Sequence, residues 1–90
     1  MLTGKAKHDF IAYINVADNY LLFTNINQLH FDIIEWFDSV GIYIGVLRHL
    51  NIFQYKLNNE SKTIKNGFAV TRYWATEQAI LKANEIYNGN

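Results

Sequence analysis

Hydrophobic and polar residues follow one another along this chain in patterns that predict three helices and three strands. Over residues 25–40, apolar positions recur at intervals of 3, 4, 4 and 3, which places them on one face of a helix. These positions are Ile26, Leu29, Ile33, Phe37 and Val40. Asn25 or Thr24 can cap the start of this helix, and Gly41 stands where a helix often stops.

Two further helices are predicted near the ends of the chain. Residues 5–16 carry a short apolar stripe, and the turn pair Asp18-Asn19 should end that helix. The last helix is expected from about Arg72 to Asn88, with Thr71 as its N-cap. Mostly small residues recur along it in steps of four, which lets the helix lie close against a sheet. These residues are Ala75, Ala79, Ala83 and Tyr87.

Between those helices the pattern changes to that of β-strands. Residues 42–47 are rich in β-branched side chains, and apolar residues occupy the positions that would face either side of a sheet. This pattern predicts a central strand covered on both faces. Residues 52–57 alternate between apolar and polar, as expected for a strand with one buried face. Residues 58–67 are typical of a polar loop that ends in the turn pair Asn66-Gly67, and residues 68–71 of a third short strand.

Together these elements predict an α+β fold with the order α-α-β-β-β-α, in a single small domain spanning residues 1–90. The strands should form a three-stranded antiparallel sheet packed with helices. Two arrangements satisfy the pattern. If the first helix covers the second face of the sheet, the result is an α/β/α sandwich. If it does not, one face that bears aromatic side chains is open.

Composition narrows the classes of protein that the chain can represent. The 90 residues include no Cys, which excludes disulfides, thiolate metal ligands and Cys nucleophiles. Eight basic residues balance eight acidic ones, so a strongly basic nucleic-acid-binding surface is not expected. No apolar run approaches the ~20 residues of a membrane span, and no apolar stretch follows Lys5 and Lys7 as in a signal peptide. We therefore expect a soluble cytoplasmic protein with no membrane partner.

Residues able to carry catalysis are few and have no recognisable context. His8, His30 and His49 lack metal-ligand spacing, so we expect all three at the surface or its rim and predict no metal and no cofactor. Ser39 and Ser61 lie in no nucleophile motif. The five glycines are isolated, so they form no phosphate-binding loop. The sequence therefore predicts a protein that is not an enzyme.

Aromatic and charged residues indicate binding instead. Aromatic residues make up 16% of the chain, and Tyr, Trp and Arg dominate the energetics of protein interfaces. Residues 1–45 carry a net charge of −3 and residues 46–90 a net charge of +3. We predict partner contacts at the start of the last helix and on an acidic edge of the middle helix. The residues are Arg72, Tyr73, Trp74, Asp32, Glu35 and Asp38.

An RNA-binding role is one alternative, and a homodimeric structural protein is another. The α-β-β-β-α part of the predicted order is that of double-stranded-RNA-binding domains, which contact phosphates with basic residues in a loop and at a helix start. Here Lys62, Lys65 and Arg72 are expected to lie together near that loop and the start of the last helix. The last helix opens with Arg72-Tyr73-Trp74, however, where that family has a Lys-rich run.

Three stretches, Leu2–Lys7, Phe37–Ile44 and Lys82–Asn88, resemble small uncharacterised proteins encoded by phages and prophages of AT-rich Bacteroidota. The shared features are a helix stop, a core strand and an Ala-rich closing helix, so the resemblance transfers no catalytic residue. It implies a phage-type anti-defence inhibitor of the anti-CRISPR kind, which binds a host defence protein stoichiometrically. A CRISPR–Cas effector or its guide is the partner that this resemblance favours, in the cytoplasm of a bacterial host.

Overall fold

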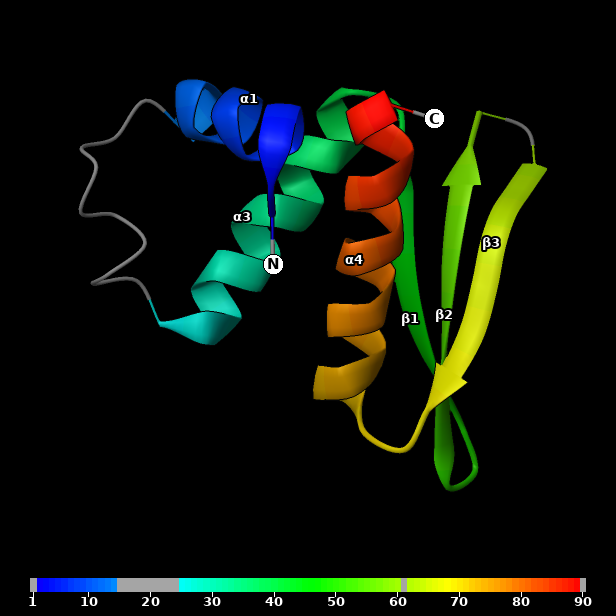
Figure 1. The fold of residues 1–90 in the computed structure, drawn as a ribbon. Helices are drawn as coiled ribbons and strands as arrows, with labels where there is room; N and C mark the ends of the chain where they lie inside the picture. The colour runs from blue at the N-terminus through cyan, green and yellow to red at the C-terminus, as the bar shows by residue number, and fades with distance from the viewer. Residues whose placement is uncertain (1, 15–24, 61, 90) are drawn as a thin grey trace.

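The computed structural model describes residues 2–14, 25–60 and 62–89 and has the predicted α+β order (Figure 1). The turn pair Asp18-Asn19 and the end of the first predicted helix lie outside these residues. The elements, in chain order, are α1 (Gly4–Ile14), α3 (Ile26–Ser39), β1 (Tyr43–His49), β2 (Ile52–Asn59), β3 (Lys62–Ala69) and α4 (Arg72–Gly89).

The strands form one antiparallel sheet in the order β1-β2-β3, as predicted. Helices α3 and α4 pack on one face of the sheet, and α1 packs against α3 and α4 (Figure 1). Of the two arrangements that the sequence allowed, the open one is present, since no described element covers the outer face of the sheet. β1 is an edge strand that exposes Tyr43, Gly45 and Leu47 on this outer face, so the prediction of a central strand covered on both faces is wrong.

The capping signals in the sequence act as predicted. The Asn25 side chain accepts a hydrogen bond from the Gln28 N–H at 2.9 Å and so caps the start of α3. Gly41 has a φ of 90°, a left-handed conformation that glycine adopts without strain, and α3 ends at Ser39 just before it. The Thr71 hydroxyl accepts a hydrogen bond from the Trp74 N–H at 3.1 Å and fixes the start of α4.

The core lies between the inner face of the sheet and the helices. Ala75, Ala79 and Ala83 of α4 are fully buried, so the backbone of this helix approaches the strands closely. The ring of Trp36 in α3 lies 6.0 Å from that of Phe10 in α1 and 4.9 Å from that of Tyr87 in α4, measured between centroids. These aromatic contacts join the three helices. The other buried hydrophobic residues are Ala6, Ile33, Phe37, Ile42, Tyr55, Leu57 and Ile80.

The connection between β2 and β3 is shorter than the sequence predicts. β3 begins at Lys62, and Gly67 lies inside this strand opposite Tyr55, so the prediction of a polar loop over residues 58–67 is wrong. Gly67 has a different role from that of a turn residue. A Cβ atom added to it would lie 2.5 Å from the Tyr55 hydroxyl oxygen and 2.6 Å from Cζ of the same ring. The buried ring of Tyr55 therefore packs directly over Gly67.

Hydrogen bonds hold the N-terminal segment to the end of α4. The Thr3 N–H donates to Asn84 Oδ1 at 3.0 Å, and the Ala6 N–H donates to Asn88 Oδ1 at 2.7 Å. The Asn88 amide in turn donates to the Thr3 carbonyl at 2.8 Å. The first N–H groups of a helix have no partner inside it, so the asparagines of α4 satisfy donors at the start of α1.

A charged cluster extends this contact. The Asp9 carboxylate accepts hydrogen bonds from the Lys5 ammonium and from the Tyr87 hydroxyl, both at 2.5 Å. The Lys5 ammonium, the Tyr87 hydroxyl and the His8 ring lower the pKa of Asp9 well below its usual range. The bonds to Asp9 also raise the pKa of Lys5 and that of Tyr87. The cluster therefore links α1 to α4 most strongly while Asp9 is ionised.

Replacing Gly67 with alanine should lower the free energy of unfolding by about 1–3 kcal/mol, because the new methyl group must displace the buried ring of Tyr55. Gly45 in β1 is the matched control, since no atom lies within 4 Å of an added Cβ there. Gly45→Ala should leave the stability unchanged or raise it by up to about 1 kcal/mol. Urea denaturation of both variants measures the difference. Equal stability of the two variants would mean that Tyr55 does not require the glycine.

Replacing Asp9 with asparagine should remove a pH-dependent part of the stability. Because the pKa of Asp9 is lower in the folded than in the unfolded chain, the ionised carboxylate stabilises the fold above the unfolded value of about 4. This contribution is lost as the pH falls toward the folded pKa. The stability gap between the wild type and Asp9→Asn should therefore narrow steadily below about pH 4. Urea denaturation from neutral to acidic pH tests this, and a constant gap would contradict it.

Candidate functional site

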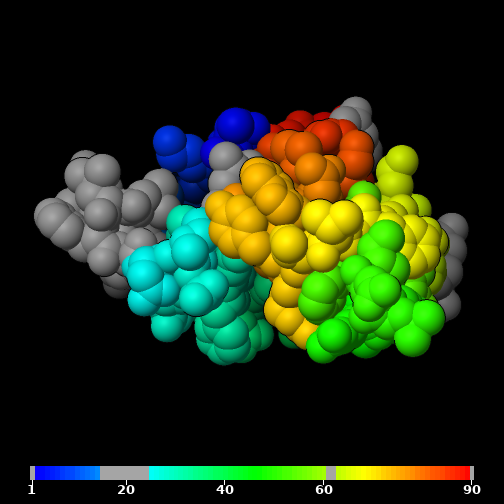
Figure 2. Space-filling view, turned by 90° about the horizontal axis from the view of Figure 1, so that it is seen from below, coloured from blue at the N-terminus to red at the C-terminus, as the bar shows by residue number. Residues whose placement is uncertain are grey.

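Exposed apolar side chains gather at one end of the molecule. Thirteen large hydrophobic residues are exposed among those described, and nine of them lie where α3 and α4 begin, β1 turns into β2 and β3 ends. Figure 2 looks onto this end, with the start of α3 in cyan, the β1–β2 turn in green and the start of α4 in amber. We call this surface the α4-start end. Its exposed apolar residues are Ile26, Phe31, Leu47, Leu50, Ile52, Phe68, Val70, Tyr73 and Trp74.

The sheet contributes one half of the α4-start end. Leu47 lies opposite Gln54, and Gln54 lies opposite Phe68, so these side chains form a row across the outer face of the three strands. His49 borders this row, with its Nε2 2.7 Å from Gln54 Oε1 and its ring centroid 6.3 Å from that of Phe68. The open face of the sheet is therefore partly apolar at this end.

The start of α4 contributes the contact residues that the sequence predicts. Tyr73 and Trp74 expose 42% and 54% of their surfaces, and their rings meet edge to face with centroids 5.2 Å apart. The Arg72 guanidinium lies over the ring of Phe53 in β2, 5.1 Å from its centroid. The structure therefore brings Arg72, Tyr73 and Trp74 together in one helical turn but gives each a different direction. Arg72 extends toward the sheet, Tyr73 toward α3 and Trp74 into solvent.

A groove of about 410 Å³ separates the start of α4 from α3. Its volume lies within the ~300–1,000 Å³ range of small-ligand pockets, so it can accept a side chain of a partner. The exposed ring of Phe31 on α3 and the ring of Tyr73 on α4 form part of its walls. The residues that line it are Asn27, His30, Phe31, Ile34, Arg72, Tyr73 and Thr76.

His30 lines this groove from α3 and is only 7% exposed, so the prediction that all three histidines lie at the surface or its rim is wrong for this residue. Its Nε2 is buried and has no hydrogen-bond partner among the described residues. The Glu77 Oε2 atom of α4 lies 3.5 Å from it, and the Tyr73 ring centroid lies 5.4 Å from that of His30. The nearest polar neighbour of this nitrogen is therefore a carboxylate on the facing helix, at a distance just beyond that of a normal hydrogen bond.

The sequence carried a signal for the burial of His30. Ile26, His30, Ile33 and Phe37 follow one another at intervals of 4, 3 and 4, which places His30 on the apolar stripe of α3. This helical position indicates burial, although a histidine side chain is polar.

Glu77 was not among the predicted site residues, yet it contacts His30 and Tyr73, which line the groove. Its Oε1 accepts a hydrogen bond from the Tyr73 hydroxyl at 3.0 Å, and the carboxylate raises the pKa of Tyr73. The Glu77 side chain is 21% exposed and forms an ion pair with no Lys or Arg in the described part of the chain. A partly buried carboxylate therefore lies beside the groove, 3.5 Å from the buried nitrogen of His30.

The predicted acidic edge is present on α3 but does not line the groove. At 3.6 residues per turn, Asp32, Glu35 and Asp38 are each rotated by about 60° from the last, so the carboxylates spread over the outer surface of the helix. Glu35 and Asp38 are exposed, and the half-buried Asp32 accepts a hydrogen bond from the Gln28 amide at 2.9 Å. The acidic edge therefore lies on the helix that forms one wall of the groove.

The basic cluster expected for RNA binding is not formed. Lys62 begins β3, whereas Arg72 follows its other end, and at about 3.3 Å per residue the strand separates Lys62 from Ala69 by about 23 Å. Lys65 lies within the strand opposite Leu57. Because β3 runs away from the β2–β3 turn, the turn and the start of α4 lie at opposite ends of the sheet. The expectation that Lys62, Lys65 and Arg72 lie together is wrong.

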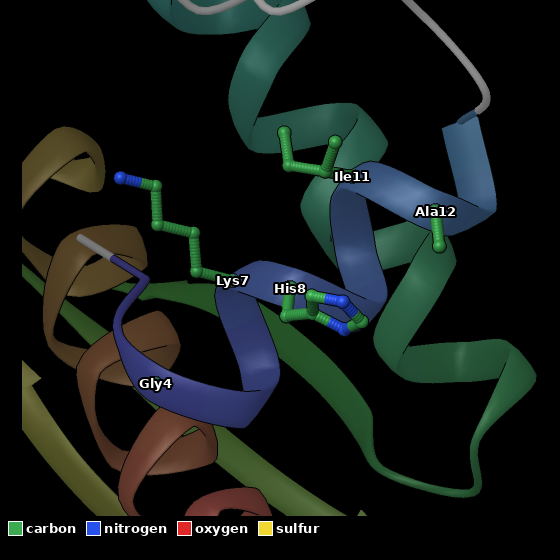
Figure 3. Close-up of a pocket in the computed structure, with 5 residues that line it drawn as sticks. All are labelled: Gly4, Lys7, His8, Ile11 and Ala12. Atoms are coloured by element: carbon green, nitrogen blue, oxygen red, sulfur yellow. The ribbon is translucent and has the colours of Figure 1, made fainter.

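A second pocket of about 380 Å³ lies against α1, lined by Gly4, Lys7, His8, Ile11 and Ala12. Figure 3 shows that the Lys7, His8 and Ile11 side chains point away from one another. Because the named residues come from one helix and their side chains do not converge, this pocket is a weaker candidate than the groove.

The remaining candidates for chemistry give no site. The Ser39 hydroxyl donates to the Trp36 carbonyl at 2.6 Å, and Ser61 lies outside the described residues. Over residues 2–14, 25–60 and 62–89, no three His, Cys, Asp or Glu side chains are placed to hold a metal ion. In the same ranges, no helix is long and apolar enough to cross a membrane.

His30→Leu should leave the free energy of unfolding unchanged or raise it by up to about 1 kcal/mol, because it removes a buried nitrogen that makes no hydrogen bond among the described residues. Thr76 on the opposite wall is the matched control, since it is 8% exposed and its hydroxyl donates to the Arg72 carbonyl at 2.8 Å. Thr76→Val should cost about 0.5–1.5 kcal/mol. Urea denaturation compares the two. A larger loss for His30→Leu would make His30 an ordinary packing residue.

No known protein family, no curated protein and no solved structure matches this chain. The phage-type resemblance and the RNA-binding alternative therefore remain predictions from the sequence.

Proposed function

We propose that this chain is a non-enzymatic binding protein that contacts another protein through the α4-start end. The observation that carries this proposal is the gathering of nine exposed large hydrophobic residues at one end of the structure. Exposed hydrophobic side chains that gather in one region of a protein are typical of interaction sites. Tyr73, Trp74 and Arg72 stand within it, and these residue types supply most of the binding energy in protein interfaces.

The partner class follows from the resemblance described above. A phage-type inhibitor of a bacterial defence system acts by stoichiometric binding, and a surface with exposed aromatic side chains suits that task. We therefore propose a host defence protein as the partner, with a CRISPR–Cas effector as the first target to test, in the cytoplasm of a bacterial host.

RNA binding is kept as a second candidate because the α3-β1-β2-β3-α4 order is that of double-stranded-RNA-binding domains. Two arginines also lie near the α4-start end. Arg48 pairs across the strands with Phe53, whose ring carries Arg72 above it. Against this candidate, Lys62 and Lys65 lie away from that pair, which leaves few basic residues to span phosphates. Phosphate-driven binding would weaken steeply as salt rises, whereas an aromatic contact would change little.

Affinity capture of the tagged protein from a CRISPR-bearing Bacteroidota lysate, with and without nuclease, tests the proposal. Replacing Arg72, Tyr73 and Trp74 together with alanine should weaken binding of the captured partner at least about 100-fold, because truncating two or three central interface residues removes that much affinity. Mass spectrometry identifies the partner, and titration of the purified pair measures the dissociation constant.

The matched control replaces three exposed apolar residues away from this end, Val40, Tyr43 and Leu81, with alanine. This control should bind as the wild type does. Unchanged binding of the Arg72, Tyr73 and Trp74 variant, with its fold intact, would contradict the proposal. Capture that vanishes with nuclease would favour RNA, and a mass that rises with concentration without any captured partner would favour a homodimer.

A further inference from the structure

The sheet has two edge strands, β1 and β3, and only one of them is protected (Figure 1). β3 carries Lys62 and Lys65, and its pairing with β2 shifts register between Leu57 and Asn58. Lysines and register irregularities keep an edge strand from pairing with another chain. Over residues 43–47, β1 has no charged residue, and its register with β2 is regular. β1 is therefore the edge that is open to a further strand.

The backbone and the inner side chains of β1 are both available at this edge. Among the described residues β1 pairs only with β2, and no backbone hydrogen bond joins it to a helix or a turn. Ile44 and Val46 lie on the same face of the strand as the buried Ile42, yet both are only partly buried. A second strand beside β1 would satisfy its outward N–H and C=O groups and cover these two side chains.

The sequence of β1 is complementary to itself in the antiparallel direction. If two copies pair about Gly45, Ile44 of one copy faces Val46 of the other, and Tyr43 faces Leu47. Each apolar pair then occurs twice, once on either side of the centre. Centring the pair on a neighbouring residue breaks up these matches, so the sequence favours one register.

Charges at the two ends of β1 also match in this arrangement. Pairing about Gly45 places Arg48 of each copy opposite Ile42 of the other, next to the end of α3. α3 has no basic residue in its last turn, and neither its Asp38 nor Arg48 forms an ion pair in the described part of the chain. A cation stabilises the C-terminal end of a helix, where the last carbonyl groups carry partial negative charge.

We propose that two copies of this chain associate through β1, antiparallel about Gly45, and form a six-stranded sheet. The same strand supplies both halves of this interface, as in other twofold dimers. The inference goes beyond the proposed function and does not depend on it. Edge pairing extends the sheet and leaves its outer face open, so a dimer formed in this way can still bind a partner there.

Sedimentation equilibrium of the wild-type full chain tests the proposal directly. The average mass should rise from that of one chain toward that of two as the concentration increases to about 1 mM, the range of a weak complex. The mass of a single chain at every concentration, or a rise beyond two chains, would overturn the proposal.

Substitutions at Gly45 identify the interface. An added Cβ meets no atom within 4 Å there, and the φ of Gly45 is not left-handed, so one copy tolerates a side chain. Gly45→Lys and Gly45→Glu should each weaken the dimer at least about fivefold, because like charges would lie opposite each other at its centre. An equimolar mixture of the two variants should dimerise again, since opposite charges then meet. Gly45→Ala is the matched control and should dimerise as the wild type does.

Two outcomes with these variants would contradict the proposal. A dimer that both charged variants leave unchanged would form through another surface. Weakening by both charges without recovery in the mixture would mean that the two Gly45 positions do not face each other. The wild-type measurement needs no variant, so it can overturn the proposal even where a variant fails to fold.

The dimer and the proposed function fail in distinguishable ways. Replacing Arg72, Tyr73 and Trp74 together with alanine should leave the dimer intact while it weakens partner binding. Loss of the dimer in that variant, with its fold intact, would assign self-association to the α4-start end and overturn the pairing through β1. Unchanged partner binding in the same variant would contradict the proposed function alone.

Discussion

The close packing of α4 on the sheet is the constraint on which the rest of the structure depends. Ala75, Ala79 and Ala83 have no exposed surface, and their small side chains allow the helix to lie directly on the strands. The position of α4 in turn sets the direction of its first turn, where Tyr73 faces His30 and Trp74 faces solvent. A larger residue on this stripe would push α4 from the sheet and open the groove against α3.

The N-terminal helix stabilises this arrangement without covering the sheet. It joins α3 through the ring of Phe10, and it joins α4 through hydrogen bonds that the Thr3 and Ala6 N–H groups donate to Asn84 and Asn88. Because these contacts bind it on the helical side, the outer face of the sheet keeps Leu47 and Phe68 exposed. Because α1 docks on the helices and completes the core there, the outer face of the sheet stays partly apolar and exposed.

His30 and Glu77 place two polar groups in the packing between α3 and α4. A leucine would fill the place of His30 without a buried nitrogen that makes no hydrogen bond, and a neutral side chain would spare the partial burial of the Glu77 carboxylate. Beside this contact, the rings of Phe31 and Tyr73 line the groove between the two helices.

The sequence by itself determined the features that depend on neighbours along the chain. The order of elements, the Asn25 and Thr71 caps, the stop at Gly41 and the alanine stripe of α4 all follow from local periodicity and local hydrogen bonds. The cluster of Arg72, Tyr73 and Trp74 was equally predictable, since adjacent residues at a helix start share one turn.

Tertiary structure alone decided the features that depend on register and docking. β1 is an edge strand because β2 lies between it and β3, and the outer face of the sheet is open because α1 docks on the helices. Asn66 and Gly67 lie in β3, where the ring of Tyr55 packs over a residue without a side chain. Lys62 and Arg72 lie far apart because the length of β3 stands between them. His30 lies next to Glu77 because α3 and α4 pack side by side. Contacts between distant residues are set by how whole elements pack, which local patterns do not encode.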